Sequence, residues 1–162
     1  MHLLLIRHAS AVARGTPGIQ EADRPLTAEG ARRFRKASKG LARILARPDV
    51  LLSSPLPRAR QTAEIVAQAF GALAPIDAPE LVDGRFESVM RLVSTQRGAE
   101  LVALVGHEPW LSASLARLVG ADDAGGFALR KGGAALLELG GTARAGATLI
   151  WLMPPRVLRQ LA

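Results

Sequence analysis

Five short runs of consecutive apolar residues are spread along the chain. Strands that are buried on both faces, as in a parallel sheet, show such continuous apolarity rather than a strict alternation of apolar and polar positions. We therefore expect five strands of a covered sheet, namely HLLLIR at 2–7, VLLSS at 50–54, LVALVG at 101–106, GAALLEL at 133–139 and ATLIWLM at 147–153.

Helices are predicted between these strands from capping residues and from proline and glycine stops. Thr27 is a suitable N-cap for a helix that continues to about Arg47, where Pro48 ends it. Proline opens and glycine closes two of the later helices. The later helices are expected at 57–71, at about 85–97, at 109–120, and as one or two turns in the C-terminal PPRVLRQLA.

The alternation of strands and helices predicts an α/β fold, a three-layer α/β/α sandwich with a mostly parallel central sheet. The early strands are expected to be parallel, and the last two to form an antiparallel pair around Gly140 and Gly141. The proline-rich stretch 72–84 is expected to be a surface connection with at most one short strand. The length of 162 residues and a hydrophobic content of 49% predict one domain over 1–162.

The charge balance raises the question of nucleic-acid binding. The formal net charge is +7, and the sequence pI is about 11.3. The basic residues are scattered, however, and their densest cluster, at 31–40, has the spacing of the solvent-facing side of an amphipathic helix. Four Phe, two Trp and no Tyr offer few platforms for stacking bases. We therefore expect no nucleic-acid partner, and interpret the charge as an affinity for anionic small ligands or acidic protein partners.

Cysteine content and hydropathy bear on the compartment. The chain has no cysteine, which excludes disulfides and thiolate metal sites. No apolar run approaches the roughly 18 residues that a membrane span needs, and no signal-peptide pattern precedes the first strand. We expect a soluble cytoplasmic protein with no membrane association. The sequence indicates no oligomeric state.

Polar residues follow three of the predicted strands at the point where each strand ends. Arg7 and His8 come after the first, SSPLPRARQT with Arg58 and Arg60 after the second, and His107 after the third. Because ligands of parallel α/β sheets bind outside the carboxyl ends of the strands, these side chains are expected to meet at one edge. Arg60 lies on a different helix face from Arg58, so we expect it in solvent or in an ion pair.

Such a cluster suits phosphoryl transfer. Arginine offers a planar fork of donors that matches phosphate oxygens, and a developing negative charge is stabilised by prearranged cations. A neutral imidazole can attack phosphorus through one ring nitrogen if a carbonyl holds the other as N–H, and His8 is the candidate. Arginines can replace the usual magnesium, and the carboxylate clusters that magnesium prefers are missing. We therefore expect neither a metal nor another cofactor.

Four motifs together resemble a known family. LIRHA near the N-terminus, SSPLPRARQTA about fifty residues later and LVGHEPWL in the third quarter resemble the signature of the histidine phosphatase superfamily, which has the phosphoglycerate-mutase-like fold. DRPLTAEG at 23–30 and the short length look most like the bacterial phosphohistidine phosphatase branch, the SixA type. The resemblance extends from Leu3 to about Met153.

The resemblance implies roles for particular residues. His8 corresponds to the nucleophile that becomes phosphohistidine, and Arg7 to its phosphate-holding neighbour. Arg58 matches the second phosphate arginine, and His107 the second histidine, which contacts the phosphoryl group. Ala9 stands where the family usually has glycine, and its methyl group bars backbone conformations that only glycine reaches.

Two assignments stay open at this stage. The proton donor to the leaving group is expected to be Glu80, with Asp83 and Glu108 as alternatives and with no dedicated acid as a further possibility. Arg24 either neutralises substrate charge or holds its loop to the sheet through Asp23.

The sequence thus favours a metal-independent phosphatase with a phosphohistidine intermediate on His8, acting on phosphohistidine in a protein substrate. One alternative is a phosphatase of the same superfamily that acts on small phosphomonoesters. Another is a phosphate-recognising module without turnover.

Overall fold

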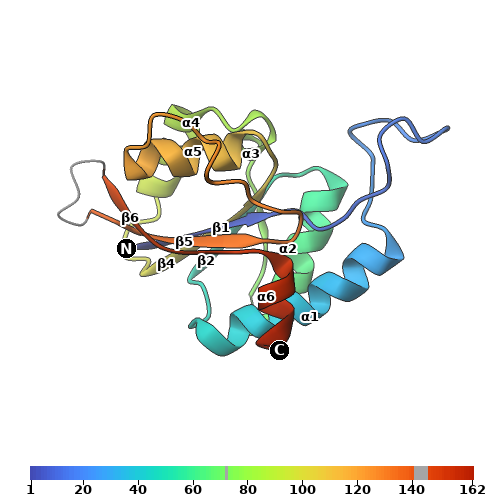
Figure 1. Ribbon diagram of the computed structural model, residues 1–162, viewed down its shortest axis with the longest axis horizontal. Coiled ribbons are helices and arrows are strands. Elements are labelled where there is room, and N and C mark those ends of the chain that lie inside the picture. The colour runs from blue at the N-terminus through green and yellow to red at the C-terminus, as the bar shows by residue number, and fades with distance from the viewer. Residues whose placement is uncertain (72, 141–145) are drawn as a thin grey trace.

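A six-stranded sheet runs through the middle of the computed structural model, which describes residues 1–71, 73–140 and 146–162 (Figure 1). The strand order across the sheet is β3-β2-β4-β1-β5-β6. The strands are β1 (His2–Arg7), β2 (Val50–Ser53), β3 (Ile76–Asp77), β4 (Leu101–Gly106), β5 (Ala134–Leu139) and β6 (Ala147–Met153).

The sheet is parallel at its centre and antiparallel at its C-terminal edge. β1 and β2 both pair in parallel with β4, and β3 pairs in parallel with β2. β5 is antiparallel to both β1 and β6. The predicted α/β fold and the antiparallel final pair are confirmed, although residue 141 of the predicted turn lies outside the described residues.

Helices cover both faces of the sheet, in the predicted three layers. Figure 1 shows α1, α2 and α6 on one side and α3, α4 and α5 on the other. The first group is α1 (Ala28–Ile44), α2 (Pro57–Phe70) and α6 (Pro155–Gln160), and the second is α3 (Glu80–Asp83), α4 (Phe86–Ser94) and α5 (Trp110–Val119). In the described part of the chain, no helix has the length and apolarity needed to cross a membrane.

The central strand β1 divides the apolar core into two parts. Leu4 and Ile6 belong to the cluster that includes α1, α2 and α6, whereas Leu3 and Leu5 belong to the cluster on the opposite face. All four side chains are at most 1% exposed. Successive side chains of a strand point to opposite faces, so a strand that is covered on both sides is apolar throughout.

Element boundaries follow the predicted caps closely at most positions. The Thr27 side chain accepts a hydrogen bond from the Gly30 N–H at 2.9 Å and begins α1, and Pro57 is the first residue of α2. The helix α1 ends at Ile44, before the predicted Arg47. Both β3 and α3 lie within the predicted connection at 72–84, which therefore has its one short strand and also a helical turn that was not predicted.

Trp110 fixes the start of α5 against the end of β4. Its side chain is 7% exposed and packs directly on Gly106 and Gly84. A Cβ atom at either glycine would overlap the indole ring. Close packing around this ring therefore holds the connection from β4 to α5 in place.

Candidate active site

His8 and His107 lie side by side because of the sheet register. β1 and β4 are adjacent and parallel, with Arg7 opposite Gly106. The residues that follow these two strands, His8 and His107, therefore lie at the same edge of the sheet. The His8 N–H donates to the Gly106 carbonyl at 3.0 Å. The ring centroids of His8 and His107 are 5.1 Å apart, and each residue is 6% exposed. Residues 99 positions apart in the sequence are thus neighbours in space.

The His8 ring is held in one tautomer. Its Nδ1 lies 2.7 Å from the Ala9 carbonyl, which can only accept, so Nδ1 carries the hydrogen and Nε2 has a free lone pair. Burial lowers the pKa of His8 to about 4 and outweighs the opposing effect of this hydrogen bond. The nearby charges of Arg58, Arg7 and Lys131 lower the pKa further. His8 is therefore neutral at pH 7.

His107 is a second neutral imidazole. Its Nε2 lies 2.8 Å from the Ser54 hydroxyl, which directly follows β2. Burial, followed by the proximity of His8 and Arg58, lowers its pKa to about 3. The Nδ1 atom is buried and has no hydrogen-bond partner within the described residues.

Arg7, which is half-buried, and Arg58, which is buried, bring two guanidinium groups to the same place. An Nη1 donor of Arg7 contacts the Leu129 carbonyl at 2.7 Å, and one of Arg58 contacts the Glu21 carbonyl at 3.0 Å. The Nε atoms of both arginines are buried and lack a partner in the part of the chain that the structure describes. Burial lowers the pKa of each arginine. Buried donors without partners are costly, and an oxyanion would satisfy them.

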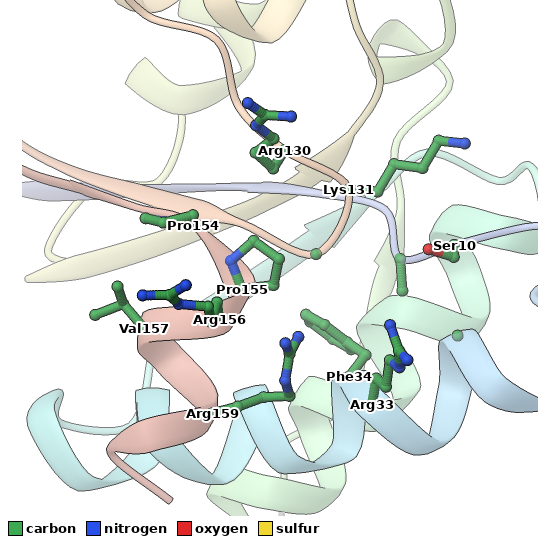
Figure 2. A pocket seen from close by; sticks show the side chains of 13 residues that line it. Ser10, Arg33, Phe34, Arg130, Lys131, Pro154, Pro155, Arg156, Val157 and Arg159 are labelled. Atoms are coloured by element: carbon green, nitrogen blue, oxygen red, sulfur yellow. The ribbon is translucent and has the colours of Figure 1, made fainter.

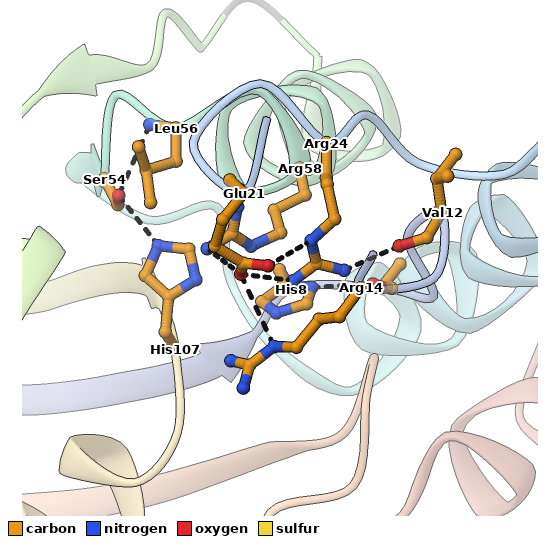
Figure 3. Close-up of polar contacts among 10 residues, drawn as sticks. His8, Val12, Arg14, Glu21, Arg24, Ser54, Leu56, Arg58 and His107 are labelled. Carbon is orange, nitrogen blue, oxygen red and sulfur yellow. Dashed lines mark hydrogen bonds and ion pairs between the residues drawn. The ribbon is translucent and has the colours of Figure 1, made fainter. Parts of the chain in front are cut away.

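A carboxylate stands among the arginines. Glu21 accepts from Nε and Nη2 of Arg24 at 2.9 and 2.7 Å (Figure 3). One oxygen of the same carboxylate lies 3.5 Å from Arg14 and 3.7 Å from Arg58. The Arg24 hydrogen bond and the surrounding arginines hold the pKa of Glu21 below its usual value. The Glu21 carboxylate is therefore a counterion, supplied by the protein itself, for Arg14, Arg24 and Arg58.

Arg24 lies at the hollow and is bonded within its own loop, to Glu21 rather than to Asp23. Its side chain is buried, lines the hollow and donates from Nη1 to the Val12 carbonyl at 2.6 Å. The expectation that it holds its loop through Asp23 is wrong, because its carboxylate partner is Glu21, three residues earlier.

The hollow at this edge of the sheet has a volume of about 630 Å³. It unites most of the predicted residues with several that the sequence did not single out. In the part of the chain that the structure describes, no group of three or more His, Asp or Glu residues is placed to hold a metal ion. The lining residues are Arg7, His8, Ala13, Arg14, Arg24, Arg58, Val82, His107, Glu108, Pro109 and Lys131.

Glu80 is not brought to the hollow. It is an exposed residue at the start of α3, whereas Val82 of the same helix lines the hollow. Residues two apart in a helix point about 200° apart, so Glu80 faces elsewhere. Asp83 is exposed and pairs with Arg85 at 3.2 Å.

Glu108 is the carboxylate that lines the hollow in the described part of the chain. It is half-buried and accepts hydrogen bonds from the Ser112 hydroxyl and, at 3.2 Å, from the Ser112 N–H. Both contacts join Glu108, which directly follows His107, to the first turn of α5 and fix the carboxylate there.

Lys131 is a lining residue that sequence reasoning missed. It precedes β5, which is antiparallel to β1 with Ala134 opposite Ile6. Because β5 runs antiparallel to β1, the beginning of β5 lies at the same edge of the sheet as the end of β1. Knowing this pairing would have placed Lys131 at the site.

Two further predictions have clear outcomes. Arg60 forms ion pairs with Asp77 at 2.6 Å and Glu64 at 3.3 Å, as expected.

The Ala9 N–H donates to the Thr62 hydroxyl at 3.0 Å, and that hydroxyl donates to the Arg58 carbonyl at 2.6 Å. The loop after β1 is thereby tied to α2, with the Ala9 methyl group buried.

Comparison with known proteins identifies the family. The model of the histidine phosphatase superfamily (branch 1) matches residues 3–87, more than half of the chain. The chain belongs to the histidine phosphatase superfamily. An uncharacterised protein of Picosynechococcus sp. (strain ATCC 27264 / PCC 7002 / PR-6) is 36% identical to it over 117 residues, which are 67% of either chain.

Solved structures of this superfamily superpose closely. A protein assigned as the phosphohistidine phosphatase SixA of Agrobacterium tumefaciens has a TM-score of 0.82 at 29% identity, and the match covers 95% of this chain and 97% of that one. The protein histidine phosphatase SixA complexed with tungstate has a TM-score of 0.82 at 25% identity, over 98% and 99%. The α-ribazole phosphatase of Shigella flexneri shares the fold, with a TM-score of 0.75 at 23% identity, over 96% and 97%.

Proposed function

We propose that this histidine phosphatase is metal-independent, forms a phosphohistidine intermediate on His8 and acts on phosphohistidine in a protein substrate. The observation that carries the proposal is the 2.7 Å contact of His8 Nδ1 with the Ala9 carbonyl. This contact leaves Nε2 unprotonated in a hollow that arginines line. An imidazole nucleophile needs that protonation state and that environment.

In the first step, His8 Nε2 attacks phosphorus, a new N–P bond forms and the bond to the leaving group breaks. Arg7 and Arg58 bind the equatorial oxygens, because each has a buried Nε donor without a partner in the described residues. His107 lies beside His8 and adds an imidazole at the phosphoryl group. Arg24, in the loop between β1 and α1, supplies further positive charge.

In the second step, water attacks the phosphorus of the intermediate. The N–P bond to His8 breaks, its electron pair returns to Nε2, and inorganic phosphate leaves with the oxygen of the water. No metal ion takes part in either step, because the guanidinium groups neutralise the phosphoryl oxygens. The arginines remain in place through both steps and need little reorganisation.

The leaving group needs a proton, and Glu108 is the better-placed donor. It lines the hollow next to His107, whereas Glu80 is exposed and lies outside the lining. A phosphohistidine leaving group carries a basic nitrogen and depends less on an acid than an alkoxide does. Replacing Glu108 is therefore expected to affect phosphomonoesters more than phosphohistidine.

Two comparisons support phosphohistidine in a protein as the substrate. The solved structures with SixA names match nearly the whole chain at 25% and 29% identity. One of them holds tungstate, a tetrahedral oxyanion. The hollow of this chain offers buried guanidinium donors suited to such an anion.

The test measures phosphate release in the presence of EDTA. The substrates are para-nitrophenyl phosphate and a protein whose histidines have been phosphorylated with phosphoramidate. We expect turnover of both with EDTA present, a higher kcat/KM for the phosphohistidine protein, and loss of at least about a thousandfold in His8→Ala. The matched control is His2→Ala, which removes a histidine from the other end of β1 and keeps activity.

Full activity in His8→Ala would overturn the nucleophile assignment. Turnover of the small ester alone would favour a small-molecule phosphomonoesterase. Phosphate binding without turnover of either substrate would favour a recognition module.

A further inference from the structure

A second hollow adjoins the first at Lys131, which lines both, and Figure 2 shows the side chains that line the second. Its volume is about 640 Å³, and it forms where α1, α6 and the segment before β5 meet. Of its lining residues, only Ala9 and Gly30 belong to the motifs that indicate the phosphatase. Its lining residues are Ala9, Ser10, Gly30, Arg33, Phe34, Arg130, Lys131, Gly132, Pro154, Pro155, Arg156, Val157 and Arg159.

The lining carries five cationic side chains and no acidic one. Arg33 is paired with Glu29 on α1. The other four, Arg130, Lys131, Arg156 and Arg159, form no ion pair with any carboxylate of the described residues. Like charges gathered around a hollow repel one another and attract anions from solution. This hollow is therefore built to receive negative charge.

One lining residue of the second hollow, Phe34, is part of the apolar core. The Phe34 ring is 2% exposed and belongs to the core cluster of that face. Gly132 has a φ of +74°, and a Cβ atom there would press on this ring at 3.1 Å. A glycine at this position therefore lets the 130–132 loop pass close to the Phe34 ring.

The two hollows share one wall. Lys131 lines both of them, and Ala9, which lines the second, directly follows His8 of the first. A ligand with a phosphoryl group at His8 can therefore extend over Lys131 into the second hollow. Such a ligand needs further negative charges near its phosphoryl group.

We propose that the second hollow binds an acidic segment of the phosphorylated protein substrate, an inference that rests on the function proposed above. The cations come from three separate parts of the fold, namely α1, the 130–132 loop and α6. Arg130, Lys131 and Arg156 are exposed, so they suit several carboxylates spaced along a chain. The enzyme thereby prefers phosphohistidine that has aspartate or glutamate nearby.

The test compares two synthetic peptides that carry the same phosphohistidine. One has four glutamates flanking it on one side, and the other has four serines in their place. We expect kcat/KM for the acidic peptide to exceed that for the neutral one by about tenfold at low salt, mainly through KM, with the ratio falling as salt is added.

The deciding variant is Arg156→Glu/Arg159→Glu, which reverses two cations of the second hollow and leaves Lys131 intact. We expect the acidic-to-neutral ratio to fall to about one or below. The matched control is Arg91→Glu/Arg97→Glu, with the same charge change at two exposed arginines of the opposite face, in and after α4. The milder Arg156→Gln/Arg159→Gln gives an intermediate ratio and guards against misfolding of the reversal variant.

Equal kcat/KM for both peptides in the wild-type protein would overturn the proposal, as would an equal loss of preference in the α4 control. A second measurement separates this proposal from the catalytic one. Fluorescein-labelled hexaglutamate should bind His8→Ala in a fluorescence anisotropy titration, and Arg156→Glu/Arg159→Glu should abolish that binding. If hexaglutamate binds but the wild-type protein turns over neither peptide, the acidic-segment site is supported and the proposed phosphatase function is refuted. If the peptides are turned over but hexaglutamate does not bind, the phosphatase function is supported and the acidic-segment site is refuted.

Discussion

At the scale of single residues, the site depends on two imidazoles that stay neutral because they are buried. Burial is the largest influence on both, lowering the pKa of His8 to about 4 and that of His107 to about 3. Nearby arginines act in the same direction, because a second positive charge beside a cation is unfavourable. The cationic environment that would attract a phosphoryl anion therefore also keeps the proposed nucleophile unprotonated.

Side-chain nitrogen NMR tests this protonation state directly. With ¹⁵N-labelled protein at pH 7, His8 should show the pattern of a neutral ring with the hydrogen on Nδ1, because the Ala9 carbonyl accepts from it. Its titration midpoint should lie near 4, well below the ordinary 6.5. A midpoint near 6.5, or the opposite tautomer, would contradict the geometry. His8→Ala identifies the resonance.

At the scale of elements, the loop between β1 and α1 carries two cations, Arg14 and Arg24, together with the carboxylate of Glu21 that faces them. Glu21 pairs with Arg24 and approaches Arg14 and Arg58. A phosphoryl group at Arg58 has to compete with this carboxylate for the same donors. The loop thus keeps the arginines together, and under the proposed function this lowers their affinity for phosphate.

The variant Glu21→Gln should bind inorganic phosphate more tightly. The amide oxygen can still accept from Arg24, while the negative charge beside Arg58 is lost. We expect the inhibition constant for phosphate to fall by about threefold to tenfold, a typical effect for one partly exposed charge pair. The control is Asp23→Asn, an exposed residue of the same loop, which should change the constant little. Weaker phosphate inhibition in Glu21→Gln would show instead that the carboxylate positions the arginines.

Sequence patterns predicted the regular elements well because local chemistry defines them. Thr27 begins a helix because its side chain accepts a hydrogen bond from a free N–H of the first turn, and Pro57 because a first helical residue needs no N–H of its own. Both predictions are confirmed by the structure. The four-residue α3 was missed because one helical turn has no periodic pattern to detect. For the same reason, nothing in the sequence could tell which way Glu80 faces.

At the scale of the whole molecule, the site is a product of topology. Arg7, His8 and His107 lie together because the strands they end or follow finish at the same edge of the sheet, where ligands of parallel α/β sheets bind. Glu21 escaped prediction because its role comes from a loop folding back on the sheet edge, which periodicity does not reveal. Lys131 escaped because its position depends on which strand β5 pairs with.

Stability should decline in mild acid because of the same two histidines. In the unfolded chain an imidazole has its ordinary pKa of 6.5, whereas in the fold the values are about 4 and 3. Between pH 6.5 and 4 the unfolded state binds more protons, so the free energy of unfolding falls as the pH falls through this window. At pH 5 the loss is about 2 kcal/mol per histidine.

Urea unfolding at pH 7 and pH 5 measures this loss. The double variant His8→Asn/His107→Asn should lose distinctly less stability between the two pH values than the wild-type protein, whereas His2→Asn should behave like wild type. Equal pH dependence in the double variant and in the wild type would refute the linkage.

The packing of Trp110 between Gly84 and Gly106 has an optical consequence. The chain has two tryptophans, and this one packs on Gly106, the residue directly before His107. Its indole emission therefore originates inside the framework of the candidate site, so the protein carries its own unlabelled reporter of events there. The second tryptophan, Trp151 on β6, can be replaced by phenylalanine to isolate that signal.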